Sequence, residues 1–285
     1  MKRSEGFKLT MFLTLLAIFM AFSSDGFAVE LKGNFQQGGM VVGHIDDGKV
    51  ASEVWLNDKP VKIGADGYFV FGFLRDEAPS AVLKIIYDDG SVAEQILEIA
   101  AQTYDIERVD GLPPKTVDIP PEELARRRIE RSKVSTARSS NGDQLHWLET
   151  FIKPAEGRIS GVYGSQRILN GSPRFPHYGL DVAAPIGTAI VAPASGVITL
   201  ADPDFLLEGG IVIIDHGFSI FSTLFHMNSV AVSLGQQVAQ GEVIGTVGQK
   251  GRASGPHVDW RINWGKVRLD PQLLLVPAVD DKLEK

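Results

Sequence analysis

Short runs of β-branched and aromatic residues, separated by turn-forming residues, recur along almost all of this 285-residue chain. In residues 29–110 the runs are MVVGHI, SEVWLN, YFVFGFL, AVLKIIY and SVAEQILEI, with DDGK, NDKP, ADGY and YDDGS between them. Valine, isoleucine and aromatic side chains favour strands, whereas Gly, Asn, Asp and Pro favour turns. The alternation predicts a mainly β protein that begins with a small β-sandwich-like accessory domain at residues 29–110.

A second, mostly antiparallel β domain is predicted at residues 151–276. Its segments GRISGVYG, HYGLDVAA, TAIVAPASGVITLA, GGIVIIDHG and FSIFSTLFHM again alternate with glycine-containing turns. Residues 277–285 are polar and are predicted to form a tail outside this domain.

Residues 111–150 join the two β domains. Their prolines predict an extended connector, and the sequence after Pro121 predicts a helix with acidic residues in its first turn. From Arg126 to Arg138 this segment is basic. A solvated linker helix is favoured as the explanation of that charge over a helix that contacts an anionic cell-wall polymer.

Residues 1–28 have the three parts of a secretion signal. Lys2, Arg3 and Lys8 precede the apolar run LTMFLTLLAIFMAF. Small residues follow at DGFA, which predicts cleavage after Ala28. The run is shorter than the roughly 20 residues of a membrane span, although an uncleaved anchor stays open as an alternative. We therefore expect an exported protein, periplasmic or secreted, without a stable membrane anchor after cleavage.

The chain contains no cysteine. This excludes disulfides, thiolate metal sites and lipid attachment to an N-terminal cysteine, so any metal must be held by histidines and carboxylates. The formal net charge is −7, and it becomes −8 when residues 1–28 are removed with three basic and two acidic side chains. Because an acidic chain without a dominant basic face binds nucleic acid poorly, no nucleic-acid partner is expected.

Two pairs of histidine and aspartate have spacings that put both members on one side of an extended chain. In SGPHVDWRIN, His257 and Asp259 are two residues apart, and in HYGLD, His177 and Asp181 are four apart. Side chains alternate between the two faces of a strand, so even spacings share a face. Such pairs can hold a metal, orient each other in a site without metal, or form an ordinary surface hydrogen bond, and spacing alone leaves all three open.

A metal held by His177, Asp181 and Asp259 would keep a fourth position open, as in catalytic zinc sites. His226 and His257 would then be free imidazoles beside it. Imidazole titrates near neutrality, so such groups can take up a proton and steady developing charge.

His216, in IDHG, lies beside a turn glycine. A turn or surface role is favoured for it over a metal role, and it is the substitute ligand if Asp259 is not one.

The motifs between about Gly157 and Leu274 also follow one another in the order of a known family. They are GVYGSQR, HYGLDVAAPIGTAIVAPASGVI, GGIVIIDHG, STLFHMNS and VSLGQQVAQGEVIGTVGQKGRASGPHVDW. This run resembles the lysostaphin/LytM-type zinc metalloendopeptidases of peptidase family M23, which have the duplicated hybrid-motif β fold. The resemblance implies one zinc ion (Zn2+) per chain and an endopeptidase that hydrolyses peptide bonds in the cross-links or stem peptides of peptidoglycan.

The resemblance also implies roles for individual residues. His177 and Asp181 match the first two zinc ligands, and His226 matches the isolated active-site histidine. His257 matches the first histidine of the family's HxH motif, which acts beside the metal. The implied roles are a base for His257 and stabilisation of the tetrahedral oxyanion for His226.

Asp259 departs from the family pattern, because the third zinc ligand is normally histidine. A carboxylate oxygen binds zinc at about the same distance as an imidazole nitrogen. Zinc with one histidine and two aspartates is formally neutral, however, and would be a weaker Lewis acid than zinc with two histidines and one aspartate. We therefore expect an active hydrolase with weaker zinc affinity or a higher pH optimum, and we expect Asp259→His to raise metal affinity.

Two other functions stay open. Some LytM-like proteins lack the metal site and act by binding and activating a cell-wall amidase, and Asp259 keeps this regulatory alternative open. The hairpin-like stretch VSLGQQVAQGEVIG also resembles lipoyl- or biotinyl-carrier domains, but Lys250 lacks the flanking carrier motif. The expected partners are peptidoglycan and, in the regulatory alternative, an amidase or another envelope protein.

Overall fold

A computed structural model describes residues 29–45, 48–109, 121–169 and 171–275. The predicted signal peptide (1–28), most of the proline-rich connector (111–120) and the predicted polar tail (277–285) lie outside these residues. Within them the chain is mainly β, with mostly antiparallel sheets and one α-helix, so the predicted fold class is confirmed. No helix in this part of the chain is both long enough and apolar enough to cross a membrane.

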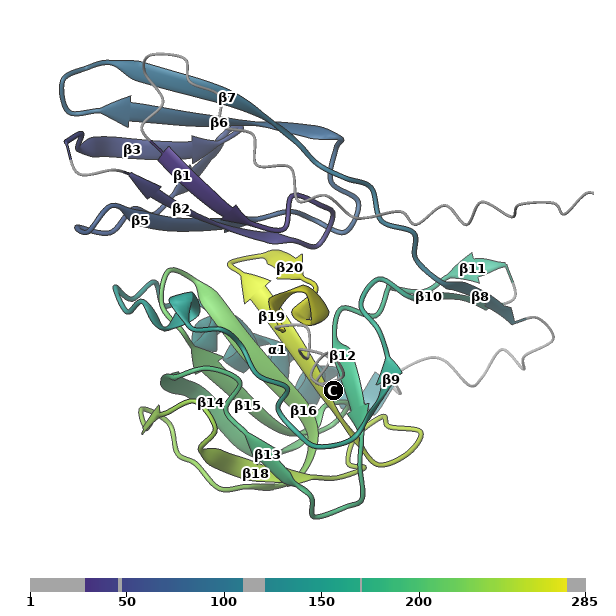
Figure 1. Cartoon of the computed structure of the whole chain (residues 1–285). Helices are drawn as coiled ribbons and strands as arrows, with labels where there is room; N and C mark the ends of the chain where they lie inside the picture. The colour runs from purple at the N-terminus through teal and green to yellow at the C-terminus, as the bar shows by residue number, and fades with distance from the viewer. Residues whose placement is uncertain (1–28, 46–47, 110–120, 170, 276–285) are drawn as a thin grey trace, which may run out of the picture.

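The N-terminal half is a small sandwich of two antiparallel sheets (Figure 1). Burial alternates along β6, and Leu83 and Ile85 of this strand pack in one core with Phe69 and Phe71 of the other sheet. This alternation is expected for sheets with one face in the core and one in solvent. In spatial order, the first sheet contains β1 (Val29–Gly33), β2 (Met40–Ile45) and β5 (Tyr68–Gly72), and the second contains β4 (Lys59–Val61), β3 (Ala51–Leu56), β6 (Ser80–Tyr87) and β7 (Val92–Glu98).

The C-terminal half is built on one ten-stranded sheet. Its central strands β15 and β16 bury almost every residue, because apolar clusters cover both of their faces. Their near-continuous apolar sequences, GGIVIID and IFSTLFHMNSV, reflect that double burial. The main path runs β17 (Gln237–Val238), β14 (Gly196–Phe205), β15 (Gly209–Asp215), β16 (Ile220–Val230), β19 (His257–Trp264), β12 (Leu180–Ala183) and β9 (Arg158–Gly161), with β13 (Ala189–Val191), β18 (Val243–Val247) and β20 (Val267–Leu269) paired beside it.

A small three-stranded sheet links the two halves of the chain. β8 (Ile106–Val109) pairs in parallel with β10 (Gln166–Leu169), which pairs antiparallel with β11 (Ser172–Pro173). Side chains add further links, because the Arg75 guanidinium donates to the Gly164 carbonyl at 2.7 and 2.9 Å. The Lys62 ammonium donates to the Gly142 carbonyl at 2.8 Å. The N-terminal sandwich is thus in direct contact with the C-terminal half.

The helix predicted after Pro121 is present as α1 (Leu124–Ala137), which follows a 3-10 turn at Pro121–Glu123. It is not a solvated linker. Its Val134 and Ala137 pack on Phe205, Phe221 and other apolar residues of the large sheet. Two charged residues of the helix, Arg127 and Glu130, are buried. α1 is therefore part of the C-terminal fold and covers one face of its sheet.

Candidate metal site

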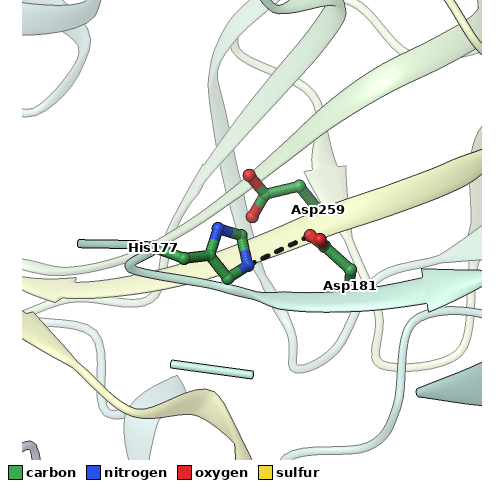
Figure 2. A group of neighbouring side chains, drawn as sticks. All are labelled: His177, Asp181 and Asp259. Atoms are coloured by element: carbon green, nitrogen blue, oxygen red, sulfur yellow. Dashed lines mark ion pairs between the residues drawn. The ribbon is translucent and has the colours of Figure 1, made fainter. Parts of the chain in front are cut away.

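His177, Asp181 and Asp259 point toward one another across two neighbouring strands of the large sheet (Figure 2). Asp181 on β12 lies directly opposite Asp259 on β19 in the antiparallel register. Residues opposite each other in such a pair have Cβ atoms about 5 Å apart. One ligand atom from each of the three side chains lies within 4.8 Å of the others. Among the described residues, no other group of three histidines or carboxylates has this arrangement.

The loop before β12 fixes the position of His177. The His177 N–H donates to the Ser165 carbonyl at 2.8 Å, and its own carbonyl accepts from the Gly164 N–H at 2.8 Å. These two bonds bring the imidazole Nε2 to 3.1 Å from Asp181 Oδ1.

Glycines leave room for the two carboxylates. A Cβ atom on Gly179 would collide with the Asp259 carboxylate, and a Cβ atom on Gly161 would collide with that of Asp181. Gly179, the glycine within HYGLD, is therefore required to make room for a carboxylate of the site rather than to form a turn.

His226 and His257 lie side by side, with ring centroids 4.7 Å apart. The Nδ1 of His226 is 2.8 Å from the Lys250 carbonyl oxygen, and the Nδ1 of His257 is 2.8 Å from the Gly255 carbonyl oxygen. A carbonyl oxygen only accepts hydrogen bonds, so Nδ1 carries the proton in both rings. With Nδ1 protonated, the neutral form of either ring has its lone pair at Nε2, and the Nε2 of His257 lies 3.9 Å from Asp181 Oδ1.

An irregularity in β16 brings His226 to this face of the sheet. Phe225 packs against Arg261 and His226 against His257, although Arg261 and His257 share one face of β19. Consecutive residues of a regular strand would point to opposite faces. His226 breaks the alternation with a φ of 62°, next to a shift in register between β15 and β16. Its N–H donates to the Glu208 carbonyl at 2.7 Å.

The first two ligand atoms fit a metal ion. His177 Nε2 and Asp181 Oδ1 are both buried without a hydrogen-bond partner, although they face each other at 3.1 Å. Buried polar atoms are normally satisfied, and a cation held between these two atoms would satisfy both. Ligands about 2.1 Å from a tetrahedral zinc ion lie about 3.4 Å apart, which is close to the observed separation of 3.1 Å.

Comparison with known proteins identifies the family of this region. Residues 175–271 match the model of peptidase family M23. This part of the chain is a peptidase family M23 domain. The peptidoglycan DD-endopeptidase ShyA of Vibrio cholerae is 32% identical over 124 residues, which are 43% of this chain and 29% of that protein. The cell division protein DipM of Caulobacter vibrioides is 31% identical over 129 residues, 45% of this chain and 20% of that protein.

One solved structure resembles most of the chain. A crystal structure described as a putative peptidase M23 from Pseudomonas aeruginosa superposes with a TM-score of 0.64 at 28% identity. The match covers 85% of this chain and 95% of that one. The likeness therefore extends beyond the M23 domain, whereas the curated relatives above match this chain over less than a third of their own lengths.

Arg261 is a residue of the M23 site that the sequence prediction missed. Its Nε lies 3.1 Å from Asp259 Oδ1 and 3.0 Å from Oδ2, and its Nη2 lies 2.5 Å from Oδ2. The guanidinium also packs over the Phe225 ring at 4.7 Å. A carboxylate has about four lone-pair sites, and metal-bound carboxylates usually accept outer hydrogen bonds, so Arg261 leaves room for a metal. The three side chains together fit a zinc ion.

The charges of the M23 site shift several pKa values. Burial opposes ionisation of Asp259, but the Arg261 guanidinium outweighs it and holds the pKa of this carboxyl below its usual range. Burial also lowers the pKa of His226, which favours its neutral ring. For His177 burial again acts to lower the pKa, yet contact with Asp181 and the charge of Asp259 raise it overall. A proton on His177 therefore competes with a metal ion.

His216 is not part of the site. It follows the last residue of β15 and precedes a turn glycine, as predicted, but it is fully buried, so a surface role is wrong. Its Nδ1 is 2.7 Å from the Ser195 carbonyl oxygen and its Nε2 is 2.8 Å from Ser222 Oγ. Burial lowers its pKa to about 4, so the ring is neutral and structural.

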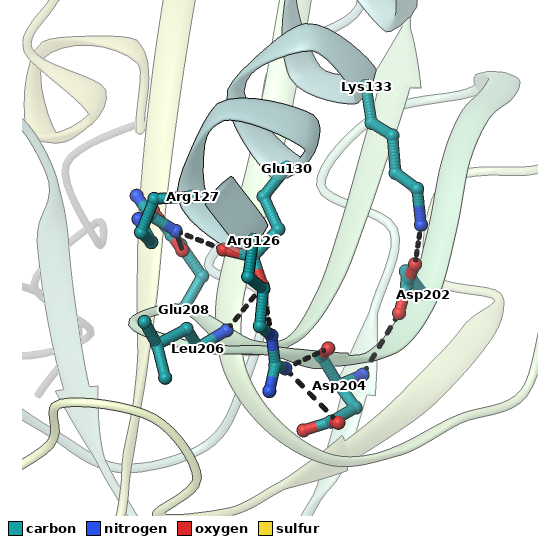
Figure 3. A network of polar contacts seen from close by, with 8 residues as sticks. All are labelled: Arg126, Arg127, Glu130, Lys133, Asp202, Asp204, Leu206 and Glu208. Carbon is teal, nitrogen blue, oxygen red and sulfur yellow. Dashed lines mark hydrogen bonds and ion pairs between the residues drawn. The ribbon is translucent and has the colours of Figure 1, made fainter. Parts of the chain in front are cut away.

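A network of ion pairs ties α1 to the loop beside the site (Figure 3). Arg127 contacts Glu130 at 2.6 Å and both oxygens of Glu208 at 2.5 and 3.0 Å. Glu208 is the residue whose carbonyl accepts the His226 N–H. Further along the network, Arg126 contacts Glu130 and Asp204, and Lys133 contacts Asp202. These basic side chains of α1 are thus paired within the chain rather than displayed for a wall polymer.

Proposed function

We propose that the protein is an exported, zinc-dependent endopeptidase that hydrolyses peptide bonds of peptidoglycan. The observation that carries the proposal is the facing, unsatisfied pair of His177 Nε2 and Asp181 Oδ1, with Asp259 within ligand distance. Two free imidazole nitrogens beside them supply proton-transfer groups. The M23 match and the peptidoglycan DD-endopeptidase of Vibrio cholerae support the peptidoglycan substrate, and residues 1–28 support export.

His177, Asp181 and Asp259 would hold one zinc ion. When bound, zinc supplies a Lewis acid for the carbonyl of the peptide bond that is cut. The roles of the protein's own side chains follow from their hydrogen bonds. Because Nδ1 of His257 donates to Gly255, the Nε2 lone pair of this ring is free to accept a proton from water, as a general base requires.

His226 has the same orientation, with Nδ1–H donating to the Lys250 carbonyl. Its Nε2 accepts a proton when the ring is neutral, and the resulting Nε2–H can donate to a developing oxyanion or to the departing amine. Neither ring can rotate without losing its carbonyl partner. The base role of His257 is further supported by its Nε2, which lies 3.9 Å from a proposed ligand oxygen.

The Asp259–Arg261 contact favours a second candidate function, a regulatory module that engages a cell-wall amidase. In this alternative the guanidinium takes the place of a metal ion as the counter-charge of Asp259. The ligand atoms of His177 and Asp181 weigh against it, because neither has a hydrogen-bond partner and a cation between them would satisfy both.

Digestion of purified peptidoglycan sacculi by residues 29–285 separates the two functions. Released fragments are identified by mass, with zinc supplied and with a chelator, and with His257→Ala as the matched inactive control. We expect peptide cleavage that depends on zinc and is absent in the variant. Intact sacculi in the presence of excess zinc would contradict the endopeptidase, and stimulation of an added amidase would then support the regulatory function.

A further inference from the structure

Asp259 and Arg261 form one unit in the structure. Three donor–acceptor contacts of 2.5 to 3.1 Å join the carboxylate and the guanidinium, and the Asp259 residue is only 2% exposed. The Arg261 guanidinium packs over the Phe225 ring, 4.7 Å from its centroid. Both residues come from the same face of β19, two positions apart, so the strand itself holds them together.

The positive charge of Arg261 changes the net charge of the metal site. A divalent ion with Asp181 and Asp259 as anionic ligands is formally neutral, but the adjacent guanidinium returns the total to +1. A set of two neutral histidines and one aspartate gives the same total. We propose that Arg261 belongs to the metal-binding set as the counterion of Asp259, so that the pair replaces a neutral histidine ligand. This inference rests on the zinc site of the proposed function.

The pairing reverses one expectation from the sequence. From the sequence alone, Asp259→His is expected to raise metal affinity, because zinc with two aspartates and one histidine is the weaker Lewis acid. With Arg261 included, this substitution removes the counterion and leaves an unpaired guanidinium beside a divalent ion. A guanidinium nitrogen about 3 Å from a ligand oxygen is within about 5 Å of the metal, where repulsion weakens binding about tenfold even at the dielectric constant of water.

The test is the affinity of the mature chain, residues 29–285, for zinc alone, measured at one pH by competition with a chromogenic chelator. We expect Arg261→Gln to tighten zinc binding at least about tenfold and Asp259→His to weaken it by a similar factor. The double variant Asp259→His/Arg261→Gln restores the original net charge and is expected to bind within about threefold of the unsubstituted chain. Arg268→Gln is the matched control for loss of a nearby positive charge, because the Arg268 guanidinium packs over the Tyr178 ring and interacts with Asp259 only through charge at a distance.

Loss of folding does not make the test ambiguous. If Arg261→Gln alone fails to fold because Asp259 is buried without a partner, the zinc affinity of the double variant is compared with that of Asp259→His. These two variants also differ only at position 261. Equal or weaker zinc binding after removal of Arg261 overturns the inference while the zinc enzyme stands. Zinc binding only after removal of Arg261 supports the inference and overturns the proposed function. Absence of zinc binding in every variant overturns both.

Discussion

Removing Arg127 should destabilise the C-terminal half far more than removing Arg126, although both side chains contact Glu130. The side chain of Arg127 is 8% exposed and that of Arg126 is 39% exposed. Breaking a buried ion pair by removing one partner costs about 3 to 5 kcal/mol, because the remaining charge is left without compensation. An exposed pair contributes at most about 1 kcal/mol.

The structure places Arg127→Met at the lower end of that range. Glu130 keeps the Leu206 N–H at 2.8 Å and the Arg126 guanidinium, and Glu208 is 22% exposed and can reach water. We therefore expect a loss of about 3 kcal/mol for Arg127→Met and less than about 1 kcal/mol for Arg126→Met.

Urea unfolding followed by tryptophan fluorescence measures the difference, since Trp147, Trp260 and Trp264 all lie in the C-terminal half. At an m-value of about 2 kcal/mol per molar urea, Arg127→Met shifts the midpoint down by about 1.5 M, and Arg126→Met shifts it by less than about 0.5 M. Equal shifts in the two variants would refute the claim that burial of Arg127 decides the effect.

The same substitution tests whether α1 supports the site. Because Arg127 holds the Glu208 side chain and the Glu208 carbonyl accepts the His226 N–H, Arg127→Met should speed hydrogen exchange of that amide. Arg126→Met should leave its exchange close to that of the unsubstituted chain. If Arg127→Met leaves the exchange rate of the His226 amide unchanged, the helix does not act on the site through Glu208.

Three further predictions concern the site and the core. His177→Ala should weaken zinc binding by about 100-fold or more, whereas His257→Ala should abolish hydrolysis and leave the zinc affinity within about threefold. Comparable losses of zinc affinity in the two variants would contradict these separate roles. Gly179→Ala should weaken zinc binding because its Cβ displaces the Asp259 carboxylate, measured by the same chelator competition. Burial lowers the pKa of His216 to about 4, so as the pH falls the unfolded chain takes up this proton before the folded chain does. The free energy of unfolding should therefore be unaffected above about pH 6.5 and fall by about 1.4 kcal/mol per pH unit between there and about pH 4. Urea midpoints at about pH 7.5 and about pH 5.5 measure that slope, which His216→Gln should remove.

Local patterns in the sequence predicted the β class and the start of α1, because both depend on neighbouring residues. Alternating burial along β6 and the turn residues between strands are visible over spans of a few residues. The docking of α1 was not predictable in this way. Arg127 and Glu208 are 81 positions apart, and nothing in the helix sequence distinguishes a charge paired with a distant carboxylate from a charge in solvent.

At the site, the even spacings paired His177 with Asp181 and His257 with Asp259, and the structure brings Asp181 opposite Asp259 through the pairing of β12 with β19. Three other features lay beyond the spacing. Arg261 carried a signal, since it lies two residues after Asp259 on the same strand face, but a guanidinium is not a metal ligand and the ligand pattern does not point to it. His226 reaches the site through a broken alternation that no spacing encodes. His216 resembled a turn residue, and its burial depends on Ser195, 21 positions away.

The backbone of His226 shows why the functional unit is larger than the matched M23 region. A φ of 62° is unfavourable for a residue with a side chain and costs about 1 kcal/mol or more, so surrounding contacts must hold it. Two of these contacts are hydrogen bonds to carbonyls: the Lys250 carbonyl accepts from the His226 ring and the Glu208 carbonyl accepts from the His226 N–H. Glu208 is itself held by Arg127, which lies on α1 and outside residues 175–271. A domain cut at the start of the M23 match would therefore keep every proposed zinc ligand but lose the contact that supports the conformation of His226.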